Sequence, residues 1–237
     1  TKLKDIISQL ESLAPLAYQE PYDNSGLIVG DSTTEVTSTL ITLDCTEVIV
    51  EEALAKGANL IIAHHPIVFS GLKSLTGKTY IERTVIKAIK NDIAIYAAHT
   101  NLDNVDFGVS KKICDKLGLV NTSVLAPKSG DLLALSVFVP RESAEKLREA
   151  LSKGGAGALG NYDSCSFSSN GEGRFKPLEE SNPYKGNKGE LEVVEEQRVD
   201  VVFPSYMRSK VLDVMKRNHP YEEVAYFLTK LENSNSY

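Results

Sequence analysis

The chain has 237 residues, a net charge of −6 and a pI of about 5.4. Apolar residues make up 42 % and charged residues 24 %, a balance that allows a packed core and argues against wholesale disorder. The acidic balance also argues against nucleic acid as a partner, because phosphate binding needs a basic field. No apolar run approaches the ~18 residues of a membrane span.

The three cysteines, Cys45, Cys114 and Cys165, are far apart and form no CxxC pair. This pattern argues against a disulfide framework and against a cysteine-rich zinc site. The first 17 residues place their apolar side chains at helical spacing and lack the solid apolar block of a signal peptide. We therefore expect a cytoplasmic protein.

The first half of the chain alternates strand-like and helix-like patterns. Short, β-branched runs predict buried strands over 39–43, 59–63 and 93–97. Helices are expected between Thr46 and Gly57, over 80–90 and over 109–117. Such an alternation indicates βαβ units, and therefore a parallel sheet with right-handed crossovers.

The second half follows a different plan. A turn-rich stretch contains an expected linker over 126–130, which separates a domain at 1–125 from one at 131–237. The pattern then predicts strands over 132–139, 198–203 and 224–231, and helices over 142–153 and 205–217. The polar middle, 164–189, is expected to form a long loop or a hairpin. Two β-α-β passes around such a middle resemble a ferredoxin-like unit.

Five polar residues stand at or just beyond the ends of the predicted parallel strands. Asp44 ends the first strand, His64 and His65 follow the second, and His99 and Asp103 follow the third. The carboxyl ends of parallel strands share one edge of the sheet, so these side chains should converge there. Imidazole and carboxylate suit Zn²⁺, Mn²⁺ or Fe²⁺, and two such ions can activate one water for hydrolysis.

Plainer interpretations stay open. The histidines can be solvent-exposed strand ends and the two aspartates helix caps, although their repeated placement at strand ends favours metal. His99 can also serve beside the metal, by orienting Asp103 or by moving protons near bound substrate. Asn24 and Gly26 belong either to a turn that leads into a strand or to the rim of the pocket.

His219 and Glu223 stand four residues apart, as metal ligands on one helical face do. Pro220 disfavours helix at this point, however, so a turn or a small-domain binding surface is the preferred interpretation.

Long segments of the chain resemble the Nif3-like family, whose bacterial members are named GTP cyclohydrolase 1 type 2 homologues. In the first half these segments are DNSGLIVGD (23–31), the stretch around LIIAHHP (41–69) and the stretch around AHTNLD (94–119). In the second half, 160–177, 182–186 and 219–233 resemble the insertion domain of longer bacterial members, which is similar to the trimeric PII/CutA proteins.

The resemblance implies a three-layer α/β domain with a mainly parallel sheet, plus a ferredoxin-like (PII/CutA-like) α+β insertion domain. It implies two divalent metal ions per subunit, zinc first and iron or manganese next, held by His64, His65 and Asp103. His99 matches a histidine beside that site and is the expected catalytic residue. The implied partners are a small-molecule substrate and further copies of the chain, in a toroidal homohexamer.

We therefore expect a dinuclear-metal-dependent hydrolase that acts, in the manner of a GTP cyclohydrolase, on a purine nucleotide or a related heterocycle. The alternative is a non-catalytic regulatory scaffold that binds a metal or a metabolite. Longer family members continue beyond the insertion domain and supply a further His and Glu to the metals, so we expect this chain to be part of a longer protein. His219 and Glu223 match the insertion domain's own HPYEE motif (219–223) and do not replace that pair.

Overall fold

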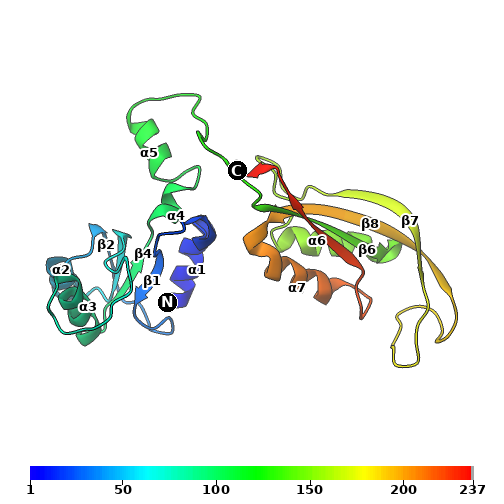
Figure 1. Cartoon of the computed structure of the whole chain (residues 1–237), viewed down its shortest axis with the longest axis horizontal. Coiled ribbons are helices and arrows are strands. Elements are labelled where there is room, and N and C mark those ends of the chain that lie inside the picture. Colours follow the sequence, from blue (N-terminus) through cyan, green and yellow to red (C-terminus); the bar gives the residue numbers. More distant parts are fainter. Residues whose placement is uncertain (236–237) are drawn as a thin grey trace. The chain divides into compact units, whose positions relative to one another are not determined.

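The computed structural model describes residues 1–235, and the chain divides into two units after Thr122 (Figure 1). Each unit has its own sheet and its own buried apolar core. The stretch expected as a linker, 126–130, contains the short strand β5 (Lys128–Ser129). This strand pairs with β10 (Ser234–Asn235) in a separate two-stranded sheet.

Four strands form the sheet of the first unit, in the order β1-β4-β3-β2. They are β1 (Gly26–Val29), β2 (Thr39–Asp44), β3 (Leu60–His65) and β4 (Ala94–Ala97). The pairs β2–β3 and β3–β4 are parallel, whereas β1 runs antiparallel to β4. The sheet is therefore mainly parallel, as the sequence predicts.

Helices cover both faces of this sheet. One face packs against α2 (Glu47–Ala55) and α3 (Tyr80–Lys90), and α1 (Leu3–Leu13) lies on the other (Figure 1). Because side chains alternate along a strand, Ile61 of β3 joins the first core while Leu60 joins the second. Three short helices complete the unit: η1 (Leu16–Tyr18), α4 (Thr100–Asp103) and α5 (Val109–Lys116). The unit has the three expected layers.

The start of α3 is fixed by local hydrogen bonds that also fasten the preceding loop. The hydroxyl of Thr79 accepts the backbone N–H of Glu82, which satisfies one of the free donors of the first helical turn. The Glu82 carboxylate in turn accepts the backbone N–H and the hydroxyl of Thr76, at 2.8 and 2.9 Å, and the N–H of Lys78 at 3.1 Å. The loop that follows the two histidines therefore has a defined end.

The second unit is an antiparallel sheet with two helices on one face. The strands, in the order β7-β8-β6-β9, are β6 (Leu132–Pro140), β7 (Phe167–Phe175), β8 (Glu192–Pro204) and β9 (Tyr226–Leu231). The 3-10 turn η2 (Arg141–Ser143) leads into α6 (Ala144–Lys153), and η3 (Ser205–Met207) leads into α7 (Arg208–Asn218). Both helices pack over Leu135, Val199 and Phe203. This order of elements is ferredoxin-like, as expected.

Strand β7 lies inside the stretch expected to be a loop or a hairpin. It pairs with β8 along its whole length, from Phe167 opposite Asp200 to Phe175 opposite Glu192. Most of its side chains are exposed, because β7 is an edge strand outside the main helix-covered core. Its polar, glycine-bearing sequence therefore lacks the apolar alternation by which strands are recognised.

Candidate metal centre

Three imidazoles meet where two parallel strands end. His64 and His65 are the last residues of β3, and His99 stands two residues beyond β4 as the N-cap of α4. Each offers one ligand nitrogen, and these nitrogens all lie within 4.8 Å of one another. The ring centroids are 5.0, 5.3 and 5.6 Å apart. Three imidazole nitrogens this close together could hold a metal ion, and imidazole is a ligand that zinc, copper and iron accept.

Each of the three rings is held by an oxygen at its Nδ1 atom. His64 Nδ1–H donates to the backbone carbonyl of Ala98, His65 Nδ1–H to Asp44 and His99 Nδ1–H to Asp23, each at 2.8 Å. Carbonyl and carboxylate oxygens only accept, so Nδ1 carries the hydrogen in each ring. Nε2 is then the atom with the free lone pair, which is the form that a metal requires.

The two aspartates expected at this edge take different places. Asp103, the last residue of α4, brings Oδ1 to 3.9 Å from Nε2 of His64, beside the three-histidine group. Asp44 ends β2 and accepts the hydrogen bond from His65. Thr46, not Asp44, is the N-cap residue of α2. Asp44 thus orients the ring of His65. In the part of the chain that the structure describes, Asp103 is the carboxylate that pairs with Nε2 of His64.

Asp23 belongs to the site, although no pattern in the sequence marks it as a site residue. Its side chain is 0 % exposed and accepts hydrogen bonds from His99, from the backbone and hydroxyl of Thr100, from Ser25 and from the N–H of Asn24. Burial alone raises the pKa of Asp23, but these hydrogen bonds outweigh it and hold the pKa well below its usual value. The Asp23 carboxylate therefore stays ionised although its side chain is shielded from solvent.

The two rim candidates lie beside Asp23. Asn24 donates from Nδ2 to the carbonyl of Val68 at 2.6 Å, which ties this segment to the loop after the two histidines. Gly26 begins β1 with φ +113°, a backbone conformation that side-chain-bearing residues rarely adopt. Phe69, half-exposed in the same loop, brings its ring to 6.4 Å from that of His99. The rim of the site is therefore partly aromatic.

A model of the family described as Duf34/NIF3 (NGG1p interacting factor 3) matches residues 1–219. The chain belongs to this family. It is 43 % identical over 232 residues to the GTP cyclohydrolase 1 type 2 homolog of Bacillus subtilis (strain 168), and the match covers 98 % of this chain and 62 % of the relative. The homolog of Staphylococcus aureus (strain COL) is 34 % identical, with 100 % and 64 % covered.

A solved structure of a Bacillus cereus protein related to NIF3 superposes on this chain with a TM-score of 0.86 and 43 % identity. That match covers 100 % of this chain and 63 % of the other. The Staphylococcus aureus protein SA1388 gives a TM-score of 0.69 and 30 % identity. This Duf34/NIF3 chain thus spans less than two thirds of the length of these relatives.

The fourth histidine of this chain, His219, lies in the second unit, where it is hydrogen-bonded to the backbone. It is 8 % exposed, donates from Nε2 to the carbonyl of Phe138 at 2.9 Å and accepts at Nδ1 from the backbone N–H of Tyr221 at 3.1 Å. Both ring nitrogens are therefore engaged. Burial lowers the pKa of His219, against a smaller raising effect of the bond to Phe138. His219 is the C-cap of α7, and residues 219–223 are not helical, as Pro220 predicts.

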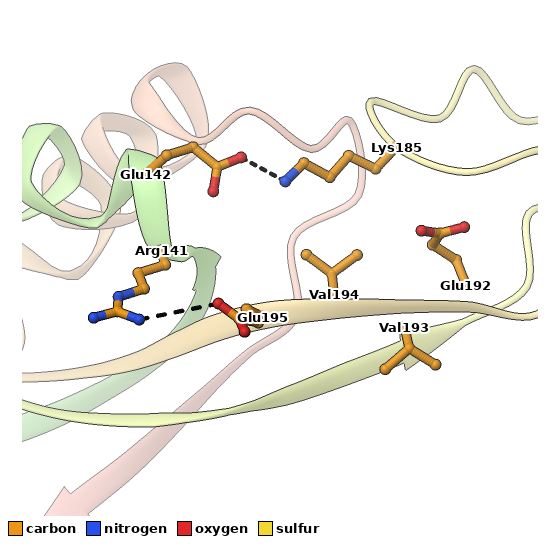
Figure 2. A pocket seen from close by; sticks show the side chains of 7 residues that line it. All are labelled: Arg141, Glu142, Lys185, Glu192, Val193, Val194 and Glu195. Carbon is orange, nitrogen blue, oxygen red and sulfur yellow. Dashed lines mark ion pairs between the residues drawn. The ribbon is translucent and has the colours of Figure 1, made fainter.

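The second unit of the Duf34/NIF3 chain also carries a groove of about 540 Å³ beside the start of β8 (Figure 2). Two ion pairs line it: Lys185 reaches Glu142 at 2.5 Å, and Arg141 lies 4.0 Å from Glu195. Glu192 adds a third carboxylate. Val194 points up between these pairs (Figure 2). The groove offers no group of metal ligands comparable with the three histidines.

No helix within residues 1–235 is long and apolar enough to cross a membrane.

Proposed function

We propose that this chain carries the metal-binding part of a dinuclear-metal-dependent hydrolase. One observation carries the proposal: three imidazoles, each fixed through Nδ1, present their free nitrogens together at the carboxyl edge of a parallel sheet. In the proposal His64, His65 and Asp103 hold two divalent cations, zinc first and iron or manganese next. Divalent cations bound there supply the Lewis acidity that makes water nucleophilic near neutral pH.

The residues around the cations have separate tasks in this proposal. Asp23 engages Nδ1 of His99, so the lone pair of its Nε2 is free. In this proposal that nitrogen joins the three-histidine group while no substrate is bound. It moves a proton between water and substrate once it is released. The proposed substrate is a purine nucleotide, as in GTP cyclohydrolase chemistry, or a related heterocycle. The names of the curated relatives and the half-exposed ring of Phe69 beside His99 support this class.

The first experiment measures transition metal per chain by elemental analysis, and GTP turnover in the same preparations. We expect about two equivalents of metal in the unmutated chain and their loss from a His64→Ala, Asp103→Ala double variant. His219→Gln is the matched control, since it replaces a histidine of the other unit. Metal without turnover of GTP or of other purine and pteridine compounds favours the alternative, a non-catalytic metal-binding scaffold. The proposal is contradicted if stoichiometric metal is absent both from the unmutated chain and from a longer version that includes the further His and Glu implied by the family resemblance.

We also propose that copies of this protein assemble into a toroidal homohexamer in the cytoplasm. The edge strand β2 supports self-assembly, because it leaves Ile41 78 % and Leu43 59 % exposed. The free thiols of Cys45, Cys114 and Cys165 suit a reducing compartment. Light scattering after size exclusion tests the assembly, and a monomeric mass at micromolar concentration contradicts it.

A further inference from the structure

The carboxylate of Asp23 is surrounded by hydrogen-bond donors. Oδ1 accepts the N–H of Asn24 at 2.6 Å and Nδ1–H of His99 at 2.8 Å. Oδ2 accepts the N–H of Thr100 at 3.0 Å, the hydroxyl of Thr100 and the hydroxyl of Ser25 at 2.9 Å. All of these bonds form at a side chain with no exposed surface. Water cannot compete for them, so their geometry is fixed.

This arrangement determines which nitrogen of His99 carries the hydrogen. An ionised carboxylate only accepts, and both of its oxygens here face donors. The ring therefore presents Nδ1–H to Asp23, and Nε2 keeps its lone pair on the side of His64 and His65. With the opposite tautomer, Nε2–H would point into the cluster and could not coordinate.

A second carboxylate–imidazole pair at the same site serves as an internal comparison. Asp44 accepts Nδ1–H of His65 at the same distance, 2.8 Å, but Asp44 is 62 % exposed and His65 48 % exposed. Water competes for both partners of that pair, and exposed ion pairs contribute little. The two pairs thus match in chemistry and differ in burial.

We propose that Asp23 is a positioning residue of the metal centre, which holds His99 in its Nδ1–H tautomer so that Nε2 completes the three-nitrogen group. The inference rests on the metal site of the proposed function and not on its reaction. Asp23 acts through His99 and touches no metal itself. Partners of this kind change metal affinity by about 10- to 100-fold when they are removed.

Asp23→Asn separates orientation from packing, because the two side chains have nearly the same shape. The amide oxygen can serve the donors of Thr100, which leaves the amide NH₂ facing Nδ1 of His99. That contact favours the opposite tautomer, as in other sites where Asn replaces a histidine-orienting Asp. The matched control is Asp44→Asn, which makes the same change at the exposed pair.

The direct test is nitrogen-15 NMR of the histidine rings in the metal-free full chain, at about pH 8, well above the ordinary histidine pKa. The chain has only four histidines, and His99→Gln assigns the signals of His99 by their loss. We expect His99 to be protonated at Nδ1 in the unmutated chain and in Asp44→Asn, and at Nε2 in Asp23→Asn. A ring protonated at Nε2 in the unmutated chain overturns the proposal, as does an unchanged tautomer in Asp23→Asn.

Zn²⁺ affinity, measured by competition with a chromophoric chelator, gives the second readout. We expect Asp23→Asn to bind Zn²⁺ about 10- to 100-fold more weakly, and Asp44→Asn to change affinity less. Equal losses in the two variants contradict the role of burial. If Asp23→Asn does not fold, Thr100→Ser and Ser25→Ala keep the carboxylate, and both should retain the tautomer and the affinity. The ring spectra of the metal-free chain test Asp23 even if the proposed hydrolase activity is absent.

Discussion

Nδ1 of His64 lies 2.8 Å from the carbonyl oxygen of Ala98, which joins the end of β3 to the residue that follows β4. The acceptor belongs to the main chain, so no side-chain substitution at position 98 removes it directly. The other two rings depend on side chains, Asp44 and Asp23. His64 is therefore the ring whose orientation follows most directly from the pairing of the strands.

Adding Zn²⁺ should stabilise the first unit and not the second. A ligand that binds only the folded state stabilises it by about 2.7 kcal/mol at a concentration 100 times its dissociation constant. Scanning calorimetry of the full chain with Zn²⁺ and with a chelator should resolve this shift. His64→Ala should abolish it, whereas a shift of equal size in that variant places the metal elsewhere.

Glu82 should make the first unit sensitive to acid. Hydrogen bonds from the backbone N–H and hydroxyl of Thr76, with further help from Lys78 and Thr79, lower the pKa of Glu82 to about 2 despite the opposing effect of burial. The folded pKa lies below the ordinary 4.5, so the stabilisation is complete above 4.5 and disappears as the pH falls towards 2.

Denaturant unfolding across this range checks the contribution of Glu82. The unmutated first unit should lose stability, and part of that loss should be missing in Glu82→Gln. Identical pH profiles for the two chains would show that the carboxylate is not held as described.

His219 should make the second unit less stable in weak acid. Its folded pKa lies below the ordinary 6.5, because burial disfavours the charged ring. The unfolded chain then binds the proton more readily, so stability is complete above 6.5 and falls as the pH drops through the lower folded value. In His219→Gln the unfolding midpoint of the second unit should depend less on pH in this range. An equal dependence points to other groups.

Gly173→Ala should destabilise the second unit by about 1–3 kcal/mol. A Cβ at position 173 would stand 2.2 Å from Oε2 of Glu196, whose carboxylate is buried and accepts the hydroxyl of Tyr221 at 2.9 Å. The carboxylate must then move and lose that bond. Gly171→Ala is the matched control, because it lies in the same strand with nothing within 4 Å of the added carbon. Equal midpoints in urea for the two variants would contradict this account.

Strand ends could be predicted from the sequence because they depend on local pattern. Runs such as residues 60–63 are apolar and short, and parallel pairing then brings the residues after them to one edge. His64, His65 and His99 do meet there. The direction of β1 has no such local signal, because it depends on the pairing of β1 with β4. The strand β7 has none either, because its edge sequence is polar and pairs only with β8.

Asp23 shows why part of the site could not be predicted. Its segment, DNSG, is typical of a turn, and its partner His99 lies 76 residues away along the chain. No periodicity relates two positions at that separation, so the pairing exists only in the folded chain. The hydrogen bond from Asn24 to the carbonyl of Val68 could not be predicted for the same reason, because 44 residues separate the two.

The bond between Ala98 and His64 also sets an order of events during synthesis. A growing chain that has formed β3 but not β4 carries two adjacent imidazoles without the carbonyl that orients His64 and without the third ring. The chain must first lose the conformational entropy of closing the loop between β3 and β4, and only then does it gain the contacts between these strands. Selective capture of a metal by the three nitrogens is therefore coupled to completion of the sheet, and an ion taken up earlier meets only a mobile pair of ligands.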